Sequence, residues 1–170
     1  MSSEREAYMA KVRDLIQRYG WFHQSVGGGD NGEPSFSYTV GLHPGSPELI
    51  VQILGSDLSS PLFWALYEAR ELARATGLIP VPFVSREGEG MYFWVQRVHP
   101  AVLREDLTVA CYLHEERGVE EGLVASQVVW PDEHGRWPWE SEADEVCRRQ
   151  QNLASADRAW SGAPAGWIED

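Results

Sequence analysis

Two neighbouring stretches, SFSYTVGL at residues 35–42 and ELIVQIL at residues 48–54, decide the fold of this chain. In the first stretch, apolar side chains alternate with small or polar ones, as is typical of a half-buried strand; they are Phe36, Tyr38, Val40 and Leu42. The second stretch is a nearly continuous apolar run, and it is short enough for a buried strand. We therefore expect two consecutive strands here.

Helical patterns flank these strands. Apolar residues recur at helical spacing over residues 8–19, Ser3 and Glu6 form a capping box before them, and Gly20 suits a helix C-terminus. A second helix is expected from Ser60 to Gly77, because Pro61 is tolerated at the first helical position. Further strands are expected at residues 21–26, 91–98 and 123–130, and further helices at residues 107–117 and 143–153. Residues 78–84 contain two prolines, which predicts an edge strand or no strand.

The order of these elements predicts the fold class. Strands cluster in groups between helices and do not alternate regularly with them, so we expect an α+β fold. The sheet should be mostly antiparallel, with three to four flanking helices. Since no repeat or linker divides the chain, a single domain is expected over residues 1–154, followed by a tail at residues 155–170.

Composition excludes several classes of partner. The 170 residues include 14 basic and 26 acidic side chains, for a net charge of −12, which disfavours nucleic acid and anionic membranes. No apolar run approaches the roughly 18 residues of a spanning helix. The N-terminus lacks a secretory signal, and the two cysteines, Cys111 and Cys147, are too few for a disulfide framework. These features predict a cytoplasmic protein with two free thiols.

Two local motifs resemble cofactor sites, but their context argues against that interpretation. Residues 27–32 have the spacing G-x-G-x-x-G, yet acidic Glu33, Pro34 and a strand follow where a dinucleotide site needs a helix. Residues 114–118 begin like H-E-x-x-H, but Gly118 replaces the second histidine of a zinc pair. We therefore expect no cofactor and no structural metal.

Polar residues at predicted strand ends suggest a possible catalytic site. His43 follows the strand at residues 35–42, and Asp132 and His134 follow the strand at residues 123–130. If the sheet brings these ends together, the three residues form an acid–base or metal cluster; otherwise they are unrelated surface groups. A full pocket would contain Tyr38, His43, Glu48, Gln127, Asp132 and His134, with a histidine as general base and a carboxylate orienting it.

A binding surface is the other interpretation. Residues 115–145 contain ten acidic residues against two arginines, which is typical of a solvated face or of a docking surface for a basic partner. The same region contains Trp130, Trp137, Trp139 and Glu140 on a turn made rigid by two prolines. We expect these tryptophans to pack beside the strand end at residues 38–43, either as core or as a wall against a ligand.

Three ordered motifs together resemble a known family. They are YGWF at residues 19–22, FSYTVGL with PELIV at residues 36–51, and WPDEHGRWPWE at residues 130–140 with Gln150 downstream. Over residues 16–153 the chain resembles a bacterial domain-of-unknown-function family, number four-two-six-two. The strand motifs are more distantly similar to suppressor-of-fused-like immunity domains. We therefore expect a non-catalytic binding or immunity-like module for a basic protein or a small molecule, with a small enzyme as the alternative.

Overall fold

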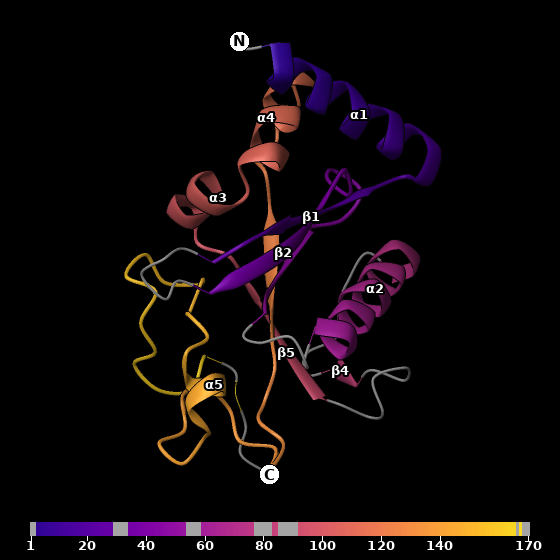
Figure 1. Cartoon of the computed structure of the whole chain (residues 1–170). Coiled ribbons are helices and arrows are strands. Elements are labelled where there is room, and N and C mark those ends of the chain that lie inside the picture. Colours follow the sequence, from indigo (N-terminus) through magenta and orange to yellow (C-terminus); the bar gives the residue numbers. More distant parts are fainter. Residues whose placement is uncertain are drawn as a thin grey trace.

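The described part of the chain contains six strands that form one sheet in the order β1-β2-β3-β6-β5-β4 (Figure 1). The structure is a computed structural model that describes residues 3–28, 34–53, 59–76, 83–84, 92–165 and 167. The strands are β1 (Phe22–Val26), β2 (Ser35–Val40), β3 (Glu48–Ile53), β4 (Phe83–Val84), β5 (Tyr92–Arg97) and β6 (Ala125–Val129). The helices are α1 (Ser3–Tyr19), α2 (Ser59–Thr76), α3 (Pro100–Asp106), α4 (Thr108–Glu116) and α5 (Glu145–Arg148). Neighbouring strands are antiparallel except β3 and β6, so the predicted α+β class with a mostly antiparallel sheet is confirmed.

Two apolar layers cover the two faces of the sheet. Helices α1, α3 and α4 pack their buried side chains against one face, in a cluster that contains Val12, Leu103 and Leu113 with Tyr38 and Ile50 of the strands. The other face packs against α2 and α5. The apolar side chains of the period-two pattern in β2, Phe36, Tyr38 and Val40, all belong to the cluster on the α1, α3 and α4 side of the sheet.

The one parallel pair, β3 and β6, determines which strand ends lie together on each side of the sheet. Glu48 at the start of β3 pairs with Ala125 at the start of β6, and β2 ends beside the same point because it is antiparallel to β3. We call this side the α4 edge, since α4 contacts β2. The C-terminal end of β6 lies at the opposite side, near α5 (Figure 1), which we call the α5 edge.

The helices of the C-terminal half match the prediction only in part. The helix predicted at residues 107–117 is confirmed as α4. A helix that the sequence did not predict, α3, precedes it, and these two helices meet at Leu107, whose φ of −96° and ψ of 45° interrupt the helical path. The first of them begins at Pro100, after His99 accepts a hydrogen bond from the backbone N–H of Ala101. The helix predicted at residues 143–153 is only the four residues of α5.

The chain after α5 leaves the helical path because glutamines of the sheet hold its backbone. Gln52 Oε1 accepts from the N–H of Gln151 at 2.6 Å, and Gln127 Oε1 accepts from the N–H of Leu153 at 2.9 Å. Further along, Arg158 pairs with Asp106 of α3. The G-x-G-x-x-G stretch at residues 27–32 and the edge strand considered at residues 78–84 lie largely outside the described residues.

Candidate functional site

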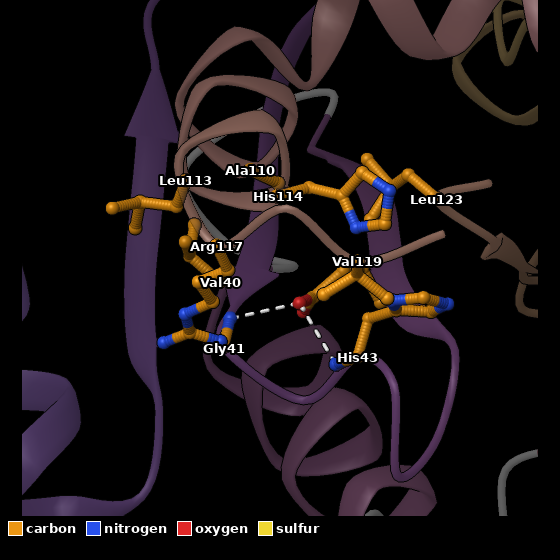
Figure 2. A pocket seen from close by; sticks show the side chains of 10 residues that line it. Val40, Gly41, His43, Ala110, Leu113, His114, Arg117, Val119 and Leu123 are labelled. Atoms are coloured by element: carbon orange, nitrogen blue, oxygen red, sulfur yellow. Dashed lines mark hydrogen bonds between the residues drawn. The ribbon is translucent and has the colours of Figure 1, made fainter. Parts of the chain in front are cut away.

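A buried carboxylate organises the turn between β2 and β3. Glu48 is only 2% exposed, and its carboxylate accepts a hydrogen bond from Thr39 Oγ1 at 2.7 Å. It also accepts hydrogen bonds from the N–H groups of Gly41 at 2.8 Å and His43 at 3.1 Å (dashed lines, Figure 2). Gly41 has a φ of +105°, which a residue with a Cβ rarely adopts, and it lies against Ile16. The turn therefore requires the glycine, and the carboxylate holds it closed.

Burial changes the protonation of Glu48. It raises the pKa of this carboxyl to about 7, although the hydrogen bonds from Thr39, His43 and Gly41 favour the charged form and oppose the shift. A carboxyl with this pKa exchanges its proton near neutral pH, as a general acid or base must.

Two histidines lie beside this carboxylate. His43 is 8% exposed, and its ring meets that of His114 from α4 edge to face, with 5.0 Å between the ring centroids (Figure 2). Burial lowers the pKa of His43, and the nearby His114 lowers it further, whereas Glu121 acts in the opposite direction. The His43 Nδ1 atom is buried and has no hydrogen-bond partner.

These groups line a narrow crevice under α4. Its lining residues are Val40, Gly41, His43, Glu48, Ala110, Leu113, His114, Arg117, Val119 and Leu123. The volume of about 10 Å³ corresponds to roughly one water molecule. The arrangement can therefore hold a water or the tip of a ligand between a carboxyl, two imidazoles and a guanidinium.

Asp132 has a different role from the one expected. Its side chain accepts four hydrogen bonds, from the N–H groups of His134 and Arg136 at 2.9 Å each, from Asp144 N–H at 3.1 Å and from Arg136 Nε at 2.8 Å. Burial opposes ionisation, but the N–H groups of Arg136, Asp144 and His134 and the Arg136 guanidinium outweigh it, so the pKa of Asp132 lies below its ordinary value. This carboxylate closes the turn after β6 and has its lone pairs occupied.

The structure does not bring His43 together with Asp132 and His134. His43 lies at the α4 edge, whereas Asp132 and His134 follow the opposite end of β6. The length of β6 alone separates the two edges by roughly 13 Å at about 3.3 Å per residue. The predicted cluster of these three residues is therefore wrong, and the described residues contain no group of three or more histidine, cysteine or carboxylate side chains placed to hold a metal ion.

Three further predicted binding residues lie inside the sheet. Tyr38 is 1% exposed, and its hydroxyl accepts from the N–H of Val109 at 3.4 Å. Gln127 is fully buried and donates to the carbonyl of Gln151 at 2.8 Å. The Trp130 indole donates to the carbonyl of Gln52 at 3.1 Å. These contacts connect the sheet to the helices and to the C-terminal segment.

The tryptophans form a separate cluster at the α5 edge. Trp137 stacks on Trp139 with 5.2 Å between ring centroids, and both contact Trp167 edge to face. Trp94 and Trp160 complete the cluster. The expectation that these rings pack beside residues 38–43 is wrong. We call the partly exposed members, Trp139, Trp160 and Trp167, the tryptophan patch.

The acidic residues of the segment 115–145 also divide between the two edges. Glu115, Glu116, Glu120 and Glu121 lie before β6, and Glu133, Glu140, Glu142, Asp144 and Glu145 lie after it. All nine are exposed, but the buried strand separates them. The acidic run in the sequence is therefore two acidic regions in space.

Sequence reasoning missed the crevice residues His114 and Arg117. Both belong to residues 114–118, where the H-E-x-x-H spacing fails at Gly118 and gives no other local signal of a site. Their spacing of three residues near the end of a helix is the signal that places them on one side of α4.

Comparison with known proteins identifies the family. The family described as Domain of unknown function (DUF4262) matches residues 15–144. The chain belongs to this family. The DUF4262 match includes the β2–β3 turn with Glu48, the whole of α4, and the turn around Asp132. Searches of curated proteins and of solved structures found no match to the chain. No helix among the described residues is long and apolar enough to cross a membrane.

Proposed function

We propose that this DUF4262 domain is a non-catalytic binding module that recognises a basic protein partner through the tryptophan patch. The observation that carries the proposal is the partial exposure of three tryptophans packed into one cluster, Trp139, Trp160 and Trp167. Tryptophan is enriched among the residues that dominate binding energy at protein interfaces. A solvent-exposed group of them at one edge of a sheet is therefore a natural docking surface.

Charge around the patch favours a basic partner. The segment that supplies Trp139 also supplies five exposed carboxylates, at Glu133, Glu140, Glu142, Asp144 and Glu145, against exposed Arg148 and Arg149. Arg149 is already paired with Glu145 at 3.1 Å. Acidic groups around an aromatic centre attract a partner that carries lysine or arginine and speed its association.

The rigid base of the patch supports this role. Trp137 is 6% exposed and lies beneath Trp139, and the Asp132 carboxylate closes the turn that leads to both rings. Trp160 is oriented by a hydrogen bond from its indole N–H to the carbonyl of Gln150 at 2.7 Å. Side chains held in this way lose little conformational freedom on binding.

Binding of a decameric lysine–arginine peptide, followed by tryptophan fluorescence at low salt, tests the proposal. Glu142→Lys should weaken binding at least fivefold, and Trp139→Ala should do the same. Glu120→Lys is the matched control, because it makes the same charge change on an exposed residue at the α4 edge. If Glu120→Lys and Glu142→Lys weaken binding equally, only net charge is involved and the proposal fails.

The cellular setting that we propose is the bacterial cytoplasm. Cys111 and Cys147 are both free thiols, as is usual in a reducing compartment. An immunity-like role is the special case in which the basic partner is a toxin. Co-purification from the native host with cross-linking at the patch would identify that partner directly.

The crevice under α4 supports a second candidate, a small acid–base enzyme. The specific observation is that Glu48, His43 and His114 line one concave site. The pKa of Glu48 in this site is about 7. The Glu48 carboxylate accepts its hydrogen bonds from Thr39 and from backbone N–H groups, so in this candidate the carboxyl and the two imidazoles share a crevice and do not form a hydrogen-bonded dyad. Screening small metabolites by the NMR signals of His43 and His114 tests this candidate, since a substrate must shift both.

A further inference from the structure

A groove of about 400 Å³ lies between three neighbouring strands, the end of α3 and the C-terminal segment. Val26, Phe36 and Gln52 line it from the strands, and Glu105 and other polar residues line it from the opposite side. Pockets for small ligands commonly have volumes of roughly 300–1,000 Å³. The groove is therefore large enough for a small molecule, in contrast to the crevice under α4. None of its described lining residues belongs to the tryptophan patch, so it is a separate site.

The floor of the groove is a row of side chains on one face of the sheet. Val26 of β1 pairs with Phe36 of β2, and Phe36 pairs with Gln52 of β3. Directly opposite residues of antiparallel strands point to the same face, and Val26 and Phe36 both belong to the apolar cluster under α1, α3 and α4. Neighbouring strands lie about 4.8 Å apart, so the row is roughly 10 Å long. The floor is therefore apolar at its β1 end and polar at its β3 end.

Hydrogen bonds connect the polar end of this floor to a charged wall. Gln52 Nε2 donates to Gln151 Oε1 at 3.4 Å, and the Arg158 guanidinium donates to the same oxygen at 3.1 Å. Arg158 also pairs with Glu105 and Asp106, the last two residues of α3. The charged groups therefore adjoin the β3 end of the groove, and the apolar side chains lie at the β1 end.

The charged wall carries one negative charge in excess, because two carboxylates face one guanidinium. The terminal nitrogens of Arg158 donate four hydrogen bonds, to Asp106 twice, to Glu105 and to Gln151, which uses all their N–H groups. The Glu105 side chain is 69% exposed, and only its Oε2 atom accepts a hydrogen bond among the described contacts. In a protein with a net charge of −12, such a wall attracts a cation and leaves no terminal guanidinium N–H for an anion.

We propose that the groove binds a small primary amine with an aromatic body, that is, an arylalkylamine. The ammonium group donates to Glu105 Oε1, and the aromatic ring packs against Phe36 and Val26. Phe36 lies one strand away from Gln52, at which the charged wall begins, and this spacing is about 4.8 Å. A chain of two carbon atoms between the ring and the nitrogen matches this length. The proposal goes beyond the binding of a basic protein at the tryptophan patch and does not depend on it.

Titration with 2-phenylethylamine, followed by methyl signals in NMR spectra, tests this site. The methyl signals of Val26, assigned from their loss in Val26→Ala, should move because the aromatic ring of the ligand lies beside them. Those of Val12, which is fully buried in α1, should stay in place.

Two further ligands are matched controls. 2-Phenylethanol keeps the ring and the two-carbon chain but has no charge, and 3-phenylpropionate carries a negative charge instead of a positive one. Both should bind at least tenfold more weakly than the amine, because neither can pair with the Glu105 carboxylate.

Two substitutions test the contribution of the protein. Glu105→Gln should weaken binding of 2-phenylethylamine about tenfold, as expected for loss of a charge-assisted hydrogen bond. Glu120→Gln makes the same change on an exposed residue that does not line the groove, and it should leave binding unchanged. The proposal is overturned if the Val26 signals do not move, if either control ligand binds as well as the amine, or if the two glutamate variants weaken binding equally.

Discussion

Replacing Asp132 with asparagine should destabilise the protein although it changes only one side-chain atom. The carboxylate accepts two N–H groups at Oδ1 and two more donors at Oδ2. An asparagine presents an NH₂ group at one of these positions, whichever way the amide is turned. The two N–H groups that donated to that oxygen then face an NH₂ group, which cannot accept their hydrogen bonds. The ion pair with Arg136 is lost as well.

The magnitude follows from the number of hydrogen bonds lost. Leaving a buried polar group unsatisfied costs about 1–3 kcal/mol, so two such groups cost roughly 3 kcal/mol in this half-buried turn. For a chain of this size, 1 kcal/mol shifts the melting temperature by about 2–4 °C, which predicts a fall of roughly 6–12 °C. Because the pKa of Asp132 is lowered in the folded state, its contribution is present above the unfolded-state pKa and is lost as pH falls through the folded-state pKa.

Thermal denaturation at neutral pH measures the effect. Glu133→Gln is the matched control, because it makes the same carboxylate-to-amide change on a neighbouring side chain that is 83% exposed, and it should melt like the parent. The difference between Asp132→Asn and the parent should shrink when the measurement is repeated in acid. An Asp132→Asn variant that melts with the parent at neutral pH would refute the structural role of this carboxylate.

Three further predictions concern other buried groups. The pKa of Glu48 is raised to about 7, so its stabilising contribution is complete below the unfolded-state pKa and falls as pH rises towards 7. This pH-dependent loss of stability is worth roughly 3 kcal/mol, and Glu48→Gln should abolish most of it. The glutamine amide has no proton to lose in this range, and it can still accept hydrogen bonds from the N–H groups of Gly41 and His43 and donate one to Thr39. A variant whose denaturation depends on pH as that of the parent does would contradict this. Trp137→Ala should cost about 3–5 kcal/mol in chemical denaturation, the range for a buried aromatic, whereas Tyr19→Ala, 65% exposed, should have little effect. Burial raises the pKa of Cys147 to about 12, so a thiol reagent should modify the half-buried Cys111 first. The Cys147→Ser variant should keep the rate of the fast reaction, which assigns that reaction to Cys111. Faster modification of Cys147 would contradict the prediction.

The elements with a strong periodic signal were predictable from the sequence. The strands at residues 35–42 and 48–54 and the helix ending at Gly20 appear as β2, β3 and α1. Gly20 has a φ of +81°, and its N–H donates to the carbonyl of Ile16 at 2.8 Å, as its position at a helix end suggested. The apolar period that predicts these elements lies within each element, so the sequence alone was enough to predict them.

Elements that depend on distant contacts were not predictable in the same way. Residues 149–153 have a helical pattern, but Gln52 and Gln127 take up their backbone N–H groups from the sheet. The start of α3 had a readable signal, since Pro100 follows a histidine that caps the helix. Of the six residues grouped into one pocket from the sequence, only Glu48 and His43 line the crevice under α4. Their neighbour His114 comes from a helix whose position over the sheet no local pattern reveals.

The direction of a single strand pair explains why the predicted cluster failed. In a wholly antiparallel sheet, β6 would run opposite to β3, and its C-terminal end would lie beside Glu48. Asp132 and His134 would then approach His43, as the sequence-based hypothesis required. The parallel pairing of Glu48 with Ala125 reverses β6 and carries its C-terminal turn to the other edge. The same reversal leaves the crevice at the α4 edge to His43, His114 and Glu48, and it gathers the tryptophans at the α5 edge. The acid–base crevice and the tryptophan patch are therefore separate sites, because one strand runs parallel to its neighbour.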